Sequence, residues 1–177
     1  EGDMDSQLTH WMYWPSFQNI WPTLQNPSSS IQGASSTIGA WGIPAWNTLI
    51  LLTSGVTLTV AHFGVVQGKR NKAILGQLAT ILLGMLFLYY QYHEYHHAYT
   101  ALNLRLNSGI YGNLFFFLTG FHGFHVTLGT IMLTVILFRM WRGDFTPKHH
   151  FAFEAVSWYW HFVDVVWLIL FVFVYWV

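Results

Sequence analysis

The sequence predicts an all-α integral membrane protein, a bundle of four transmembrane helices, from two observations. Of its 177 residues, 54% are hydrophobic and only 8% are charged, whereas about a quarter of the residues in a soluble domain are charged. In addition, four segments are apolar over about 20 residues or more, the helix length that crosses the roughly 30 Å hydrocarbon core of a bilayer. The predicted helices cover about residues 46–66, 73–95, 110–138 and 151–177.

The first three segments are almost free of charged side chains. Residues 46–66 contain no Asp, Glu, Lys or Arg and end at a polar turn. The second segment stays uncharged up to Tyr92 and ends at Glu94. The third is rich in Phe, Gly and Leu and stops at Arg139. It is long enough to cross the membrane at a tilt.

The fourth segment carries ionisable side chains within an otherwise apolar stretch. Glu154, His161 and Asp164 all fall between residues 151 and 177. Such groups are costly where they face lipid, and they normally point into a bundle or pair with other polar groups. We therefore expect this helix to pack against protein.

The basic residues predict the orientation in the membrane. All seven Lys and Arg residues except Arg105 lie in two loops, 67–72 and 139–150. Short loops rich in Lys and Arg remain on the cytoplasmic or matrix side. We place both loops there. Residues 1–44, expected to form an extramembrane loop, and the C-terminus then lie on the periplasmic or intermembrane-space side.

Composition excludes several classes of function. The seven basic and seven acidic residues balance, so the chain has no basic field for nucleic acid phosphates, and we expect no nucleic acid partner. The absence of cysteine excludes disulfides, zinc–thiolate sites and iron–sulfur clusters formed by this chain. The sequence begins at Glu1 without an initiator Met, which suggests a split, processed or partial polypeptide.

The histidines raise the possibility of metal or haem ligation. His93 and His97 are spaced to share one helix face, as are His122 and His125. Imidazole is a common ligand for transition metals. A stand-alone di-haem or metal protein using these four residues is therefore an open alternative. Near the end of the first helix, His62 has no obvious partner at its depth.

Two other interpretations apply to the last helix. Glu154, His161 and Asp164 are spaced i, i+7 and i+10 on one face, as in a proton path. Alternatively, His161 and Asp164 form local hydrogen bonds that fix the packing. We favour local pairing over proton conduction, because paired buried groups cost less free energy than isolated ones.

Several motifs in order along the chain resemble cytochrome c oxidase subunit III. The longest match is WYWHFVDVVWL at residues 158–168, preceded by TGFHGFHV at residues 119–126. His149, His150 and Phe151, followed by FEA at residues 153–155, add a third motif, and Asn47 with Thr48 begins a fourth. The resemblance extends from Pro44 to the end of the chain.

This resemblance implies that the four segments correspond to the last four helices of a seven-helix fold. Family members contain no redox centre and have no catalytic or metal-ligating residues. Haem a and copper are held by partner subunits. The family binds structural phospholipid, stabilises subunit I and supports its proton uptake during oxygen reduction. Expected partners are therefore oxidase subunits I and II, membrane lipid, and cytochrome c through the complex.

The resemblance also suggests roles for particular residues. Arg139 and Arg142 look like contacts for lipid headgroups, which suits guanidinium–phosphate geometry. The sequence departs from the family in lacking the first three helices, which another polypeptide would supply if the chain is split. The expected buried polar residues or subunit contacts are Glu94, His122, His125, Glu154, His161 and Asp164.

Two questions stay open at the level of sequence. The equivalent subunit of a quinol oxidase is an alternative within the same superfamily, although the fuller match favours the cytochrome c enzyme. For localisation, the absence of a matrix-targeting pattern favours a bacterial cytoplasmic membrane over the mitochondrial inner membrane.

Overall fold

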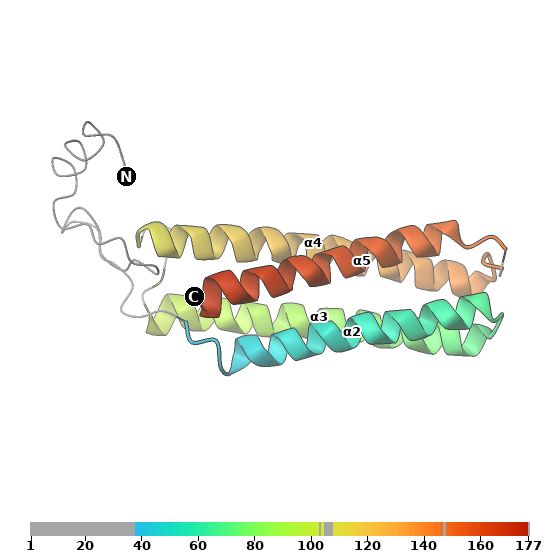
Figure 1. The fold of residues 1–177 in the computed structure, drawn as a ribbon, viewed down its shortest axis with the longest axis horizontal. Coiled ribbons are helices and arrows are strands. Elements are labelled where there is room, and N and C mark those ends of the chain that lie inside the picture. The colour runs from blue at the N-terminus through green and yellow to red at the C-terminus, as the bar shows by residue number, and fades with distance from the viewer. Residues whose placement is uncertain (1–37, 103, 105–107, 147, 177) are drawn as a thin grey trace, which may run out of the picture.

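The protein folds as a single bundle of long helices lying side by side (Figure 1). The computed structural model describes residues 38–176 apart from 103, 105–107 and 147, so most of the extramembrane loop expected at 1–44 falls outside the described residues. The elements in chain order are α2 (Ile43–Val66), α3 (Arg70–Ala101), α4 (Ile110–Arg142), α5 (Phe151–Leu170) and the π-helix η1 (Phe171–Trp176).

The predicted all-α membrane fold is confirmed. The helices α2, α3 and α4, and α5 together with η1, are each long and apolar enough to cross a membrane. Within the described part of the chain, the β pairing is limited to an isolated bridge between Thr146 and His149. This bridge lies in the connection between α4 and α5.

The helices extend further than their apolar stretches predict. α3 spans 32 residues, beginning before and ending after the expected range of 73–95, and α4 continues to Arg142 rather than stopping at 138. α2 begins at Ile43 with a proline in its first turn, where the missing proline N–H needs no partner. Hydropathy locates only the part of a helix that lies in the hydrocarbon core. The main-chain hydrogen bonds of the helix continue through the polar residues beyond it.

Two glycines define the turns at the basic end of the bundle. Gly68, with φ of 67°, lies between α2 and α3, and Gly143, with φ of 88°, ends α4. The N–H of Gly143 donates to the carbonyls of Arg139 and Met140, both at 3.1 Å. A left-handed residue that captures the last carbonyls is a common helix stop, and glycine adopts this conformation without a Cβ clash.

The last helix changes geometry near its end. We expected one continuous helix over 151–177, but α5 ends at Leu170 and continues as η1. A π-helix is wound more loosely than an α-helix, with hydrogen bonds from i to i+5. In η1 the side chains of Val174 and Tyr175 are buried, so this segment still contributes to the core.

Each helix packs against two neighbours, which closes the bundle into a ring. α2 contacts α3 most extensively, α3 contacts α4, α4 contacts α5, and α5 returns to α2. Figure 1 shows α2 beside α3 and α4 beside α5, with the turns 67–69 and 143–150 at the same end. The association of helices in a membrane depends on such close contacts. Lipid tails are as apolar as the side chains, so moving a side chain from lipid into the bundle gains little hydrophobic free energy.

Trp160 occupies the centre of this arrangement. It is fully buried on α5, and its indole N–H donates to the Ser54 hydroxyl of α2 at 2.9 Å. Its ring covers Gly84 of α3 and Gly129 of α4 so closely that a Cβ on either glycine would lie 2.7 or 2.8 Å from a ring carbon. The two glycines therefore form the slot that holds the indole.

Further hydrogen bonds connect the helices through polar side chains. The Gln77 amide donates to the carbonyl of Leu133 at 2.9 Å, linking α3 to α4. The Thr57 and Thr80 hydroxyls lie 2.8 Å apart and link α2 to α3. The Trp167 indole N–H donates to the Thr48 hydroxyl at 3.0 Å. Such bonds are worth on the order of 1 kcal/mol each inside a membrane protein.

We expect Ser54→Ala to lower the stability of the bundle by about 1–3 kcal/mol, because the buried Trp160 N–H loses its acceptor. The measurement is thermal unfolding of the purified protein in mild detergent. Thr53→Ala serves as the control, since the Thr53 hydroxyl is exposed and bonds only to its own helix. Equal melting temperatures for the two variants would show that the indole hydrogen bond contributes nothing.

Candidate functional site

The ionisable residues of α5 form two separate groups along the helix. Glu154 lies in its first turn, and Asp164 lies ten residues later, about 15 Å along the helix axis. Fully buried Trp160 lies between them in the sequence. Glu154, His161 and Asp164, which were expected along one face of the helix, therefore do not form one continuous group.

His161 and Asp164 lie close together in the interior group. The Asp164 Oδ2 atom is 3.8 Å from His161 Nδ1, and the Asp164 side chain is buried whereas that of His161 is 44% exposed. The same carboxylate oxygen lies against α2, because a Cβ added to Gly55 would fall 2.8 Å from it. The glycine thus makes room for the carboxylate where α5 meets α2. The other oxygen, Oδ1, is shielded from solvent without a hydrogen-bond partner among the described residues.

Glu94 and His122 are buried in the interior of the bundle. Glu94 on α3 is 3% exposed, and neither of its carboxylate oxygens has a hydrogen-bond partner among the described residues. The His122 ring packs against Phe87 at 5.7 Å and Trp167 at 5.0 Å between ring centroids. Both of its ring nitrogens lack hydrogen-bond partners among the described residues. This imidazole is therefore enclosed by aromatic rings.

The four histidines of the haem hypothesis have unlike surroundings. His93 and His97 are exposed on α3, whereas His122 is buried in the core. His125 is half-buried, and its Nδ1 interacts with the Phe121 carbonyl of its own helix at 2.8 Å. Although His122 and His125 are three residues apart on α4, the His122 ring lies inside the bundle and the His125 ring lies at its margin.

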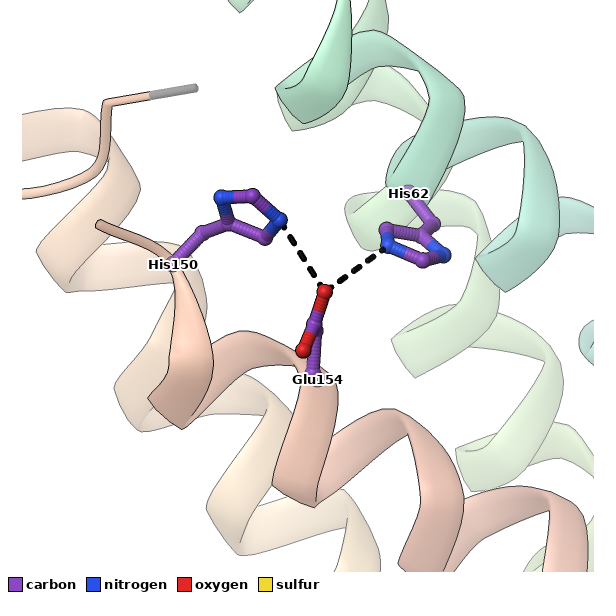
Figure 2. Close-up of side chains that lie close together, drawn as sticks. All are labelled: His62, His150 and Glu154. Atoms are coloured by element: carbon purple, nitrogen blue, oxygen red, sulfur yellow. Dashed lines mark ion pairs between the residues drawn. The ribbon is translucent and has the colours of Figure 1, made fainter. Parts of the chain in front are cut away.

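His62, for which the sequence offers no obvious partner at its depth, lies beside Glu154 and His150. Figure 2 shows the rings of His62 and His150 turned toward the carboxylate of Glu154. Glu154 Oε1 lies 3.0 Å from His150 Nε2 and 3.6 Å from His62 Nε2. The sequence held one signal for this contact: the end of the first helix and the start of the last meet at the same end of an antiparallel bundle.

The basic end of the bundle contains both arginines predicted to contact lipid. Arg139 and Arg142 are exposed at the end of α4. The Arg139 Nε atom lies 3.4 Å from Asp144 Oδ2, and its guanidinium lies 5.0 Å from the centre of the Phe145 ring. Arg139 therefore faces both the Asp144 carboxylate and solvent, and Arg142 is exposed.

Arg70 of α3, expected only as part of a basic loop, adjoins this surface. Its guanidinium donates to the Trp141 carbonyl near the end of α4. A shallow pocket next to it is lined by both turns and the ends of three helices. The lining residues are Gly64, Val65, Gly68, Arg70, Ala73, Met140, Gly143, Phe145 and Thr146.

These features define a polytopic membrane protein whose interior polar groups pair across helices. Comparison with known proteins identifies its family. The family model of cytochrome c oxidase subunit III matches residues 11–177. The chain belongs to this family.

Curated relatives from distant organisms support the same assignment. Cytochrome c oxidase subunit 3 of Marchantia polymorpha is 50% identical over 136 residues, which is 77% of this chain and 50% of the relative. The proteins of the same name from Gadus morhua and Mus musculus are 48% and 49% identical, over 79% and 76% of this chain and 52% and 50% of theirs. The chain thus spans about half the length of the curated relatives it matches.

Proposed function

We propose that this chain is an accessory, non-redox subunit III of a proton-pumping cytochrome c oxidase. It stabilises subunit I and supports proton uptake, while haem a and copper in the partner subunits transfer electrons from cytochrome c to oxygen. The family match over nearly the whole chain carries this proposal. The relatives are named for cytochrome c oxidase, which favours this donor over quinol.

The surroundings of the histidines support a non-redox role. A haem between two helices needs an imidazole from each at matched depth. His122 is instead enclosed by Phe87 and Trp167, whereas His93 and His97 are exposed on the outer surface of α3. The aromatic enclosure of His122 favours a packing role for this ring over haem ligation.

We further propose that the bundle is inserted with its basic turns on the cytoplasmic or matrix side. The connections 67–69 and 143–150 meet at one end of the bundle (Figure 1), as the positive-inside rule requires. The C-terminus then lies on the periplasmic or intermembrane-space side. A bacterial cytoplasmic membrane or a mitochondrial inner membrane suits this arrangement. The first three helices of the family fold would come from another polypeptide or from a further part of the same protein.

Gentle purification through this chain tests the main proposal. We expect oxidase subunits I and II to accompany it, together with a visible spectrum of a-type haem that is lost when those subunits are removed. Mass spectrometry of the purified sample would also identify any polypeptide that carries the missing helices. A chain isolated alone with its own Soret band would contradict the proposed role.

We propose in addition that Asp164 supports the association with subunit I, which gives a second prediction. Asp164→Ala should reduce the amount of subunit I that co-purifies more than it lowers the initial turnover of intact complexes, because a buried polar contact loses one partner. Val165→Ala is the control, since Val165 is the exposed neighbour of Asp164. If both variants retain subunit I as well as the parent protein does, Asp164 has no role in association.

We also propose that Arg139 and Arg142 bind the headgroup of a structural phospholipid. Both are exposed beside an apolar helix surface, and the guanidinium group forms paired hydrogen bonds with phosphate. Arg139→Ala combined with Arg142→Ala should lower the phospholipid retained by the purified complex and shorten its activity during sustained turnover.

The control for this variant removes two positive charges elsewhere at the basic end of the bundle. Lys72→Ala combined with Lys148→Ala eliminates two positive charges from the two basic loops without removing a guanidinium. Equal lipid loss in the two double variants would indicate a general charge effect and would contradict a specific arginine site.

A further inference from the structure

Three potential metal ligands converge at the basic end of the bundle from distant parts of the sequence. His62 lies in the last part of α2, His150 immediately precedes α5, and Glu154 lies in the first turn of α5. Their ligand atoms all lie within 4.8 Å of one another. Among the residues that the structure describes, this is the only group of three or more such atoms.

The hydrogen bond of His150 determines which of its nitrogens carries a lone pair. His150 Nδ1 lies 3.2 Å from the Thr146 carbonyl oxygen. A carbonyl only accepts, so Nδ1 is the donor, and in the neutral ring Nε2 then has a lone pair rather than a proton. That lone pair faces Glu154 Oε1 at 3.0 Å. Two hydrogen-bond acceptors, His150 Nε2 and Glu154 Oε1, repel each other at this distance unless a proton or a metal cation lies between them.

His62 places a second ring nitrogen beside the same carboxylate oxygen. Its Nε2 is shielded from solvent and makes no hydrogen bond within the described part of the chain, because Glu154 Oε1 lies 3.6 Å away. The His62 ring is packed beside Phe153, with 5.7 Å between ring centroids. A single cation placed among the three atoms would satisfy both nitrogens and the carboxylate together.

The distances suit a small tetrahedral cation. Zinc binds histidine nitrogen and carboxylate oxygen at about 2.0–2.2 Å, which places neighbouring ligand atoms about 3.3–3.5 Å apart. The two observed distances to Glu154 Oε1, 3.0 and 3.6 Å, bracket that value. Two histidines and one glutamate also form a ligand set used for zinc in proteins, with the fourth position left for water.

The hydrogen bond from His150 to the Thr146 carbonyl is also typical of a metal-binding histidine. Histidines that bind metals usually donate their other ring N–H to a carbonyl or carboxylate, which fixes the tautomer and the ring orientation. His150 makes this contact with Thr146, a residue whose backbone also pairs with His149 in the isolated bridge. The local structure of the α4–α5 connection therefore presents Nε2 toward the cluster.

We propose that His62, His150 and Glu154 bind one divalent transition-metal ion of the zinc type. The ion connects the end of α2 to the start of α5 and secures the connection between α4 and α5. The proposal holds whether or not the chain acts as a subunit of an oxidase. A metal bound only by the folded protein also stabilises it.

The test is binding of radioactive zinc to the protein purified from membranes with its accompanying subunits and stripped with a chelator. We expect the parent protein to bind one more zinc ion per chain than His62→Gln combined with His150→Gln and Glu154→Gln. Each single substitution should weaken this binding at least about tenfold, since loss of even a supporting contact costs 10–100-fold in affinity.

His149→Gln is the matched control, because His149 adjoins His150 but is exposed and outside the cluster. It should bind zinc as the parent does. Zinc at a hundred times its dissociation constant should favour the folded parent about a hundredfold and raise its melting temperature, but not that of the triple variant.

The single variants keep the proposal testable if the triple variant does not fold. Their zinc binding is compared only after gel filtration and melting without metal show an intact fold. Zinc binding unchanged in all three single variants would overturn the proposal. Variants that melt at lower temperature yet bind zinc normally would also overturn it, and would instead indicate that a proton bridges His150 and Glu154.

Discussion

The indole ring of Trp160 lies where the four helices meet, and the packing of the bundle depends on the space made for it. From α5 it reaches Ser54 on α2 through a hydrogen bond and covers glycines on α3 and α4. A tryptophan side chain has one N–H and a large apolar surface, so burying it requires one acceptor and close packing on both faces. Helix spacing at this level is therefore fixed by the thickness of an aromatic ring.

Several polar side chains of the core also bond from one helix to another. Water is absent from the hydrocarbon core of a bilayer, so a partner on another helix lowers the cost of burying a polar group. Gln77 reaches a carbonyl of α4, and Gln91 donates to the Thr119 carbonyl at 3.1 Å. Each bond fixes the register of two helices as well as contributing energy. The polar interior and the single packing arrangement are thus consequences of the same requirement.

The sequence predicted the helices well because their apolar length alone determines whether they can span a membrane. It located the ends of α3 and α4 poorly, since polar residues continue a helix beyond the lipid. The change to a π-helix after Leu170 left no recognisable pattern. Among the functional candidates, the closeness of His161 and Asp164 follows from helical spacing. The cluster of His62, His150 and Glu154 could not be predicted, because it depends on how the α4–α5 connection orients the His150 ring.

The ring order of the helices has a consequence for biosynthesis. The contacts that join α2 to α5 link residues 106 and 119 positions apart, from Ser54 to Trp160 and from Thr48 to Trp167. Chains emerge from the ribosome at about 5–20 residues per second, so α2 waits roughly 5–20 s in the bilayer before its partner is made. During that interval the Ser54 and Thr48 hydroxyls can turn to the carbonyls of their own helix at Leu51 and Pro44, bonds that both retain in the finished fold. Small hydroxylated residues therefore suit the helix that is made before its partner, whereas the indoles that complete the contact are made later.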